Sequence, residues 1–242
     1  MLSAVLLAAL ATGPCVYALE APIPGYGVFV PRWEVPGPGG KMLTLRGTVE
    51  EVAAQVRDVN PEWEDEAAHM PIVAAQDFEK RATFNDSTPT LCHNFREGNR
   101  SAASLGVDYL RTVPGRPRNG AGPSNCGRVS CRNNTGIWFC NDVSLFSSSS
   151  ARFVRSDVSM QAKKPKELGS FSDIADGAAR VLSVCQDKLD ANQDEGMTVS
   201  GQAFHRKNWN VVVRGGDDCS NTGVNITARD LKPSRLFKLF RL

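Results

Sequence analysis

The sequence predicts an α+β fold, a small disulfide-linked ββαββ sandwich in which one helix covers an antiparallel sheet. Three observations predict it. Two pairs of short apolar segments indicate two β-hairpins, and one long apolar stripe at helical spacing lies between them. Six cysteines spread over the second half and the middle of the chain indicate disulfide cross-links. We expect the ordered core to span about residues 126–219.

The first predicted hairpin joins residues 126–131 to residues 135–140. Val129 and Cys131 are expected to share one strand face, because side chains alternate along a strand. Asn133-Asn134 stands between the two segments. Asparagine tolerates positive φ, which tight hairpin turns require.

A helix and a second hairpin follow. The helix is predicted from Ser172-Asp173 onward, because apolar residues recur at i, i+4, i+7, i+8, i+11 and i+15. These residues are Ile174, Ala178, Val181, Leu182, Cys185 and Leu189. Cys185 lies in the stripe and is therefore expected to join the helix to the sheet. Residues 197–204 and 209–214 indicate the second hairpin.

The remaining parts of residues 108–242 show weaker patterns. Residues 113–123 are rich in glycine and proline and predict a loop, and residues 108–112 before them suggest a short strand. Residues 144–170 are poor in apolar side chains, which predicts a mobile insertion.

Residues 1–18 are typical of a secretory signal peptide. An apolar run precedes Val16 and Ala18, small residues at the positions that a cleavage after Ala18 requires. The run is too short to span a membrane, although no Lys or Arg precedes it. The alternatives are a membrane anchor and an apolar arm of a cytosolic protein. We expect secretion into the extracellular space.

Six cysteines follow the predicted signal peptide, and the seventh, Cys15, would be removed with it. They are Cys92, Cys126, Cys131, Cys140, Cys185 and Cys219. An even number in an oxidising compartment predicts three disulfides, with about fifteen possible connectivities left open. A metal site is the alternative, but no Cys-x2-Cys pair occurs and histidine is scarce. We expect no metal and no other cofactor.

Four Asn-x-Ser/Thr sequons follow the signal peptide as well. Their asparagines are Asn85, Asn99, Asn133 and Asn225. In a secreted chain such sequons predict glycosylation of at least one site.

Residues 19–81 are predicted to form an acidic prosegment of the basic mature domain 82–242. Lys80-Arg81 resembles the cleavage site of kexin-type proteases, and all six remaining cysteines lie after it. An ordinary exposed basic pair is the alternative. The prosegment carries a net charge of about −5 and residues 82–242 about +7. Opposite charges of this size attract at long range, so the prosegment could hold its product electrostatically; the alternative is that the two charges merely tune solubility.

The prosegment is predicted to be partly structured. Residues 41–46 alternate as a strand does. Thr48 and Glu51 then match a capping box, which begins a helix that ends at Asn60-Pro61. A unit of this size cannot bury much surface alone, so we expect it to pack on the mature domain.

His93 and His205 are the candidate catalytic residues. Two histidines beside basic side chains could cleave RNA, one as general base and the other as general acid. The alternative is that both are surface histidines without a catalytic role. The Gly-x-Ser-x-Gly, His-Glu-x-x-His and phosphate-loop motifs are absent from the sequence.

Other candidate contacts rest on aromatic, acidic and basic residues. Trp138 and Trp209 could stack on sugar rings, although packing in a small core is the commoner role of such residues. Asp217-Asp218 and Asp173/Asp176 could act as carboxylate pairs, or could end a strand and stabilise a helix N-terminus. The tail 232–242 interleaves basic and apolar residues and could contact a membrane surface or dock on the domain.

Several sequence blocks carry a resemblance to known proteins. Asn-Cys-Gly-Arg-Val-Ser-Cys at 125–131, Ile-Trp-Phe-Cys-Asn-Asp at 137–142 and Asn-Trp-Asn-Val-Val-Val-Arg at 208–214 are examples. The region 126–219 resembles fungal small secreted cysteine-rich proteins of the effector and killer-toxin-like group. The function of that group is largely unassigned. The secretion signal, the kexin-like site, the three expected disulfides and the absence of a catalytic motif favour a secreted effector or killer-toxin-like protein that binds an extracellular or host protein or glycan, without turnover and without nucleic acid. The alternatives are a secreted ribonuclease using His93 and His205, and a cell-wall carbohydrate-binding module.

Overall fold

The structure, a computed structural model, describes seven ranges of the chain. They are residues 19–37, 41–59, 84–113, 116–120, 124–141, 165–185 and 197–220.

Several sequence predictions lie outside the described residues. They are the signal peptide 1–18 with its cleavage after Ala18, the helix end at Asn60-Pro61, the Lys80-Arg81 site, Leu189 of the helical stripe, Asn225, most of the insertion 144–170 and the tail 232–242.

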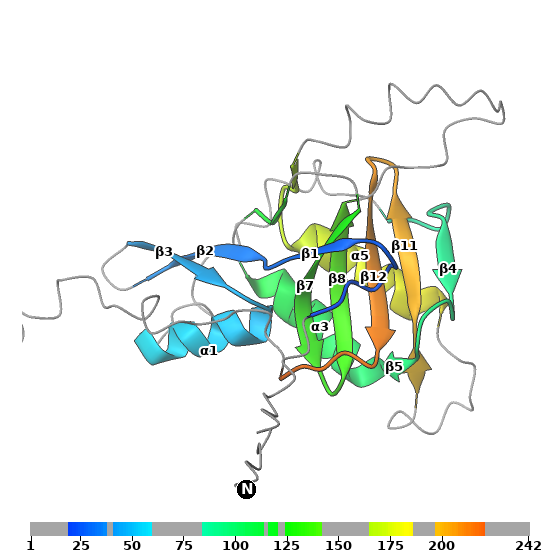
Figure 1. Cartoon of the computed structure of the whole chain (residues 1–242), viewed down its shortest axis with the longest axis horizontal. Helices are drawn as coiled ribbons and strands as arrows, with labels where there is room; N and C mark the ends of the chain where they lie inside the picture. Colours follow the sequence, from blue (N-terminus) through cyan, green and yellow to red (C-terminus); the bar gives the residue numbers. More distant parts are fainter. Residues whose placement is uncertain are drawn as a thin grey trace, which may run out of the picture.

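A six-stranded sheet forms the centre of the molecule (Figure 1), in the order β1-β7-β8-β12-β11-β4. Its strands are β1 (Gly27–Phe29), β4 (Thr90–Cys92), β7 (Asn125–Arg132), β8 (Thr135–Asn141), β11 (Gly201–His205) and β12 (Trp209–Gly215). Neighbouring strands run antiparallel, except that β1 pairs with β7 in parallel. The α+β class is therefore confirmed.

Both predicted hairpins are present. The β7–β8 hairpin turns through Asn133 and Asn134, whose φ angles are 47° and 55°. Both residues adopt the left-handed conformation that a two-residue turn of this kind requires. In the second hairpin, His205 pairs with Trp209 and Gly201 with Val213.

A β-bulge in β7 makes one strand-face prediction wrong. The register shifts between Arg128 and Ser130, so Ser130 pairs with Ile137 and Cys131 with Gly136. The extra residue, Val129, packs into the core under the helices. Because a bulge interrupts the alternation of side chains, Val129 and Cys131 do not share a face.

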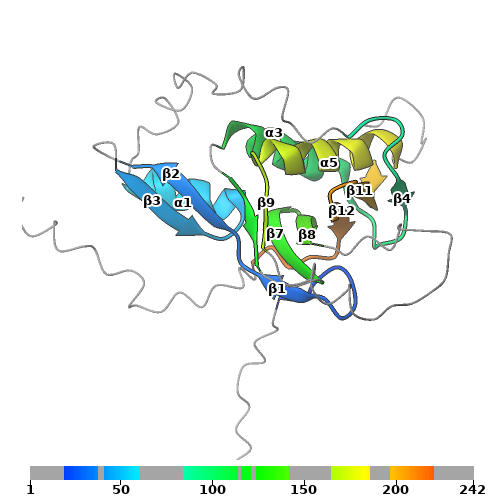
Figure 2. The same ribbon diagram turned by 90° about the horizontal axis from the view of Figure 1, so that it is seen from above.

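Two helices cover one face of the sheet, where the sequence predicted one. The predicted helix is α5 (Ser172–Val184), and the second is α3 (Arg100–Thr112), beside it in Figure 2. The expected strand at 108–112 is wrong, because these residues form the last turns of α3. Gly106 permits the close approach of this helix, since a Cβ there would lie 2.5 Å from Ser130 Oγ.

The main core lies between the sheet and these helices. It includes Ile174, Ala178, Val181 and Leu182 of the predicted stripe, together with Val107 and Leu110 of α3 and Phe139, Trp209 and Val211 of the sheet. Two short strand pairs border it: β5 (Gly98–Asn99) with β10 (Thr198–Val199), and β6 (Arg118–Asn119) with β9 (Lys166–Glu167).

Residues 32–37 and 41–59 form a second unit at one edge of the sheet. Strands β2 (Arg32–Pro36) and β3 (Met42–Arg46) pair in a hairpin, and α1 (Val49–Val59) follows. The predicted capping box is confirmed: Thr48 N donates to Glu51 Oε2 (2.8 Å) and Glu51 N to Thr48 Oγ1 (3.4 Å). The unit packs on the rest of the chain as predicted, and Trp33 stacks on Phe171 at a ring-centroid distance of 3.7 Å.

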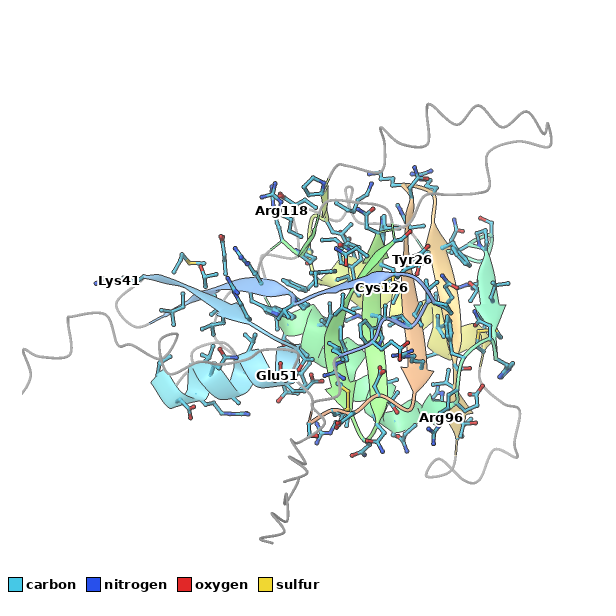
Figure 3. All side chains as sticks on the ribbon, viewed as in Figure 1. Tyr26, Lys41, Glu51, Arg96, Arg118 and Cys126 are labelled. Carbon is cyan, nitrogen blue, oxygen red and sulfur yellow. A yellow bond between two sulfur atoms is a disulfide. The ribbon has the colours of Figure 1, made fainter. Side chains whose placement is uncertain are left out.

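Residues 19–29, here called the strap, cross the sheet face that the helices leave uncovered and end in the edge strand β1 (Figure 2). Phe29, the last residue of the strap, packs against the main core. Figure 3 shows Tyr26 of the strap beside Cys126 of β7. A small buried cluster forms beneath the strap. It contains Ala21, Cys126, Trp138, Cys140 and Val212.

Three disulfides are present, as predicted, and the structure assigns their pairing. Cys92 pairs with Cys185, Cys126 with Cys140 and Cys131 with Cys219. The first joins the end of α5 to β4, which confirms the expected link between helix and sheet. Among the described helices, none is both long and apolar enough to span a membrane.

Candidate functional site

A polar hollow of about 320 Å³ opens at one end of the sheet, beside the turn of the β7–β8 hairpin. Three segments line it: the stretch from Arg96 to Asn99, the turn residues 133–135, and the stretch from Gly216 to Asp218 at the end of β12. One cation (Arg96), several carboxylates, several amides and one hydroxyl contribute. The hollow therefore offers both donors and acceptors to a polar ligand.

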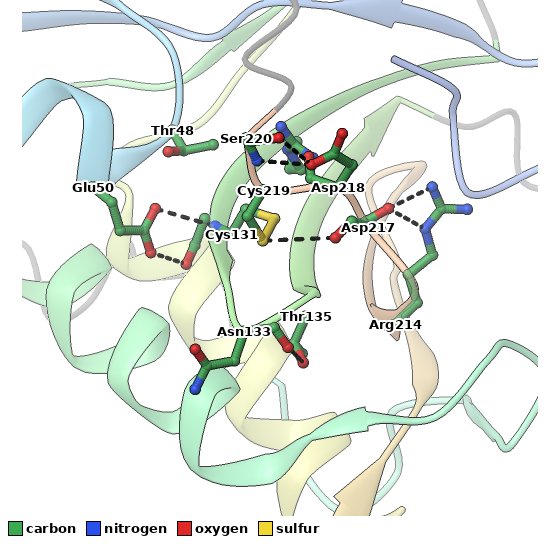
Figure 4. Close-up of a disulfide and its surroundings, with 12 residues drawn as sticks. Thr48, Glu50, Cys131, Asn133, Thr135, Arg214, Asp217, Asp218, Cys219 and Ser220 are labelled. Carbon is green, nitrogen blue, oxygen red and sulfur yellow. Dashed lines mark hydrogen bonds and ion pairs between the residues drawn. A yellow bond between two sulfur atoms is a disulfide. The ribbon is translucent and has the colours of Figure 1, made fainter. Parts of the chain in front are cut away.

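A disulfide fixes one wall of the hollow. Cys131, at the end of β7, is bonded to Cys219, which follows the lining residues of the β12 end (Figure 4). Asp217 N also donates to the carbonyl oxygen of Asn134 (3.2 Å). The chain after β12 is thus tied to the hairpin turn by a covalent bond and a hydrogen bond.

Two glycines allow the walls to approach each other. A Cβ on Gly98 would lie 2.7 Å from Thr135 Cγ2, and one on Gly216 would lie 2.7 Å from Arg96 Cδ. Gly216 also has a φ of 81°. The side chain of Arg96 therefore lies over Gly216 at the mouth of the hollow.

Asp217 links the hollow to the cluster beneath the strap. Its Oδ2 accepts a hydrogen bond from Trp138 Nε1 (2.6 Å), and its Oδ1 lies 2.7 Å from Arg214 Nη2. The guanidinium of Arg214 also lies 5.1 Å from the centre of the Trp138 ring. Because the carboxylate is buried and fully engaged, Asp217 holds the wall in place rather than offering a free charge.

Arg128 is the second cation of this cluster. It is almost completely buried, and its Nη1 donates to the carbonyl oxygen of Asp218 (2.8 Å). Burial lowers the pKa of the Arg128 guanidinium below its ordinary value, while the nearby carboxylate of Asp217 opposes that shift. Two arginines and one buried carboxylate thus surround Trp138.

His93 stands near the hollow, next to Glu97, one of its lining residues. His93 Nδ1 lies 3.0 Å from Glu97 Oε1, and Ser200 Oγ donates to the same oxygen at 2.6 Å. His93 is exposed and has a φ of 59°. These three side chains form a hydrogen-bonded group at the end of β4.

His205 lies at the other end of β11 from this group. His93 N bonds the carbonyl oxygen of Ser200, which immediately precedes β11, whereas His205 is the last residue of that strand. Five residues of strand separate the two positions by roughly 16 Å. The structure does not bring the two histidines together, so they cannot act as a base and acid on one phosphodiester.

The surroundings of His205 are those of a core residue. Its ring stacks on Trp209 at 4.7 Å, and its Nδ1 accepts a hydrogen bond from Lys207 N (3.2 Å). Burial, together with the positive charges of Lys207 and Arg206, lowers the pKa of His205 from 6.5 to about 4. His205 is therefore neutral at pH 7, which corrects its interpretation as a surface histidine.

The two candidate tryptophans are both buried, on opposite faces of the sheet. Trp138 is 0% exposed and Trp209 is 2% exposed, so neither presents a ring to a sugar in this structure. Of the candidate carboxylates, Asp173 Oδ2 accepts hydrogen bonds from Gly169 N and Ser170 N, and Asp176 pairs with Arg111 at 3.4 Å. These contacts fix the start of α5 and join it to α3.

Three of the four sequons lie in the described residues. Asn85 and Asn133 are exposed, and Asn133 is part of the hollow. The third, Asn99, caps α3, because its Oδ1 accepts a hydrogen bond from Ala102 N (2.8 Å). A glycan on Asn133 would project from the rim of the hollow.

The hollow was not predicted from the sequence. Its residues come from three segments that only the fold brings together. The signal that could have drawn attention to them is the density of glycine and polar residues beside Cys131 and Cys219. Within the described part of the chain, His, Cys, Asp and Glu form no group of three or more that could hold a metal.

Comparisons with protein-family models, with curated proteins and with solved structures find no significant match to this chain.

Proposed function

We propose that this protein is secreted and acts by binding a protein or glycan of another organism through the polar hollow, without turnover. The hollow is the observation that carries the proposal. Its donors and acceptors converge from three segments, and a disulfide holds them in a fixed arrangement. A rigid polar surface binds with a small cost in conformational entropy.

The resemblance to fungal effectors and killer-toxin-like proteins supports the same function. So do the three disulfides, since cross-linked domains of this size are common among secreted proteins. The proposal includes removal of residues 1–18, cleavage after Arg81 and glycosylation at an exposed sequon. N-terminal sequencing and intact-mass measurement of the protein from culture medium report these steps together.

Arg96 provides the test of the hollow. It is exposed at the mouth, and arginine is frequent among the residues that dominate binding energy. Fluorescently labelled wild-type protein is titrated onto intact yeast cells, plant protoplasts, chitin and β-glucan. We expect saturable binding to at least one probe, and at least a roughly tenfold weaker Kd for Arg96→Glu, which corresponds to about 1.4 kcal/mol.

The matched control is Arg206→Glu, which makes the same charge change far from the hollow. Arg206 lies in the exposed turn after His205, at the end of β11 that points away from the hollow. It should bind as the wild type does. Equal weakening by both variants would indicate nonspecific attraction between charges. Saturable binding to none of the probes, or turnover of RNA or glycan that one substitution abolishes, contradicts the proposal.

A further inference from the structure

The segment 19–59 lies in the acidic prosegment, yet it contacts both faces of the central sheet. Its first part, the strap, covers the sheet face opposite the helices. Its second part, β2, β3 and α1, lies beside β7, the strand next to the edge strand β1, and α1 also contacts α3 (Figures 1 and 2). The segment therefore reaches around the edge of the sheet.

Backbone pairing attaches the strap to this edge. β1 pairs with β7 through Val28 opposite Cys126 and Phe29 opposite Gly127, and Gly27 N donates to the carbonyl oxygen of Ser124 (2.7 Å). The ring of Phe29 lies directly on Gly127, where any side chain would overlap it. Glycine at position 127 therefore leaves the space that the ring of Phe29 occupies.

Core packing attaches the second part. Trp33 is completely buried and stacks on Phe171 at the start of α5. Val49 and Val56 of α1 are also completely buried and belong to the same core as the helices α3 and α5. Separation of the two parts would expose these side chains and their partners to water.

A few polar contacts fix the arrangement. Ser130 Oγ donates to Glu50 Oε1 (2.5 Å), and Cys131 N donates to Glu50 Oε2 (3.1 Å), as Figure 4 shows. Arg214 Nη2 donates to the carbonyl oxygen of Glu20 (2.9 Å). Glu50 thus contacts the strand that ends at the hollow.

We propose that segment 19–59 is a permanent, noncovalently held part of the folded protein, and that cleavage after Arg81 yields a two-chain complex. The inference rests on the proposed processing. The three disulfides all join residues after position 84, so no disulfide among them holds the segment. Apolar burial and strand pairing hold it, and the opposite net charges of the two parts are secondary.

The experiment cleaves the folded full-length protein at a known position. Residues 76–81 are replaced by the recognition sequence of a specific protease, and the cleaved product is passed over a size-exclusion column in dilute buffer and in about 1 M sodium chloride, where charges are screened within about 3 Å. We expect the two chains to elute together in both buffers and to separate in urea without a reducing agent.

Gly127→Ala tests the interface itself, because its methyl group would overlap the Phe29 ring. After cleavage it should release the N-terminal chain at least tenfold faster than the wild type does. The double variant Gly127→Ala/Phe29→Ala restores the space and should release it more slowly than Gly127→Ala alone. Gly169→Ala is the matched control, since its Cβ would lie 3.6 Å from Asp173 Oδ2, an ordinary contact.

Two outcomes overturn the inference: separate elution of the wild-type chains in dilute buffer, or separation in salt alone, which would indicate a purely electrostatic attachment. The engineered site keeps this result independent of natural processing. N-terminal sequencing of the unaltered secreted protein shows separately whether cleavage after Arg81 occurs. Binding to cells through the hollow is measured on the uncleaved protein, so its failure is distinguishable from failure of the complex.

Discussion

The two faces of the central sheet bury their tryptophans in different surroundings. Trp209 lies under the helices, between apolar residues and two aromatic rings, Phe84 and Phe139. Trp138 lies under the strap, and the guanidinium groups of Arg128 and Arg214 lie 5.9 Å and 5.1 Å from the centre of its ring. The helix face is thus a large apolar core, and the strap face is a small cluster with charges inside it.

The difference indicates what each face contributes. Apolar packing is nondirectional, so the helix face supplies stability without fixing polar groups at particular positions. Buried ions require partners with defined geometry, and the buried carboxylate of Asp217 has them in Trp138 Nε1 and the guanidinium of Arg214. Because Asp217 also lines the hollow, the strap face positions the candidate site.

Disulfides on the two faces offer the first and largest test of this comparison. Cys92–Cys185 joins the helix layer to the sheet, and Cys131–Cys219 fixes the hollow, with sequence separations of 93 and 88 residues. Loop entropy therefore predicts an equal loss for Cys92→Ala/Cys185→Ala and Cys131→Ala/Cys219→Ala, about 4–5 kcal/mol in the free energy of unfolding. Urea denaturation measures this loss.

The two variants are expected to differ in binding, although they lose the same free energy of unfolding. At a temperature where both are folded, Cys131→Ala/Cys219→Ala should lose the cell or glycan binding of the wild type, and Cys92→Ala/Cys185→Ala should retain it. Loss of binding in both, or in neither, would mean that the disulfide beside the hollow has no special role in positioning it.

Asp217 gives the second test. Asp217→Ala removes the partner of Trp138 Nε1 and of the Arg214 guanidinium, and we expect a loss of about 3 kcal/mol, because one buried donor and one cation are left without it. Asp218→Ala is the control, since Asp218 is exposed, and should cost less than about 1 kcal/mol. A similar loss in both variants, measured in urea, would contradict the structural role of Asp217.

The elements with a strong local pattern were predictable from the sequence. The α5 stripe, the two hairpins with the Asn133-Asn134 turn and the Thr48/Glu51 capping box depend on nearby residues, and the structure confirms each. Helix α3 was missed although Ala103, Val107 and Leu110 follow helical spacing. Gly106 and the polar residues around it weaken its pattern, and packing against the sheet compensates.

The candidate site depends on contacts between distant segments, which no local pattern encodes. Six cysteines indicated three disulfides, but the pairing of Cys131 with Cys219 depends on the bulge that turns Cys131 away from the helices. Likewise, β1 is only three residues long and is specified by its fit to Gly127 rather than by its own sequence. The two histidines looked equivalent in the sequence because burial cannot be read at single positions.

His205 gives the third test, on the helix face, and its effect depends on pH. Its folded pKa, about 4, is lower than the ordinary value of 6.5, so the unfolded chain binds a proton more readily than the folded protein does. The stability is fully present above about pH 6.5 and is lost as the pH falls toward 4. Linkage gives a maximum loss on the order of 3 kcal/mol.

Urea titrations between about pH 4 and pH 7 measure this loss as the slope of the free energy of unfolding against pH. His205→Phe should remove the part of that slope due to His205, because phenylalanine keeps a ring against Trp209 without a titrating group. His93→Gln, an exposed substitution that leaves His205 in place, should retain the wild-type slope. If His205→Phe retains the full slope, the pH dependence originates outside the helix face. If His93→Gln removes the slope, the pH dependence does not originate at His205, and the contrast drawn between the two histidines is wrong.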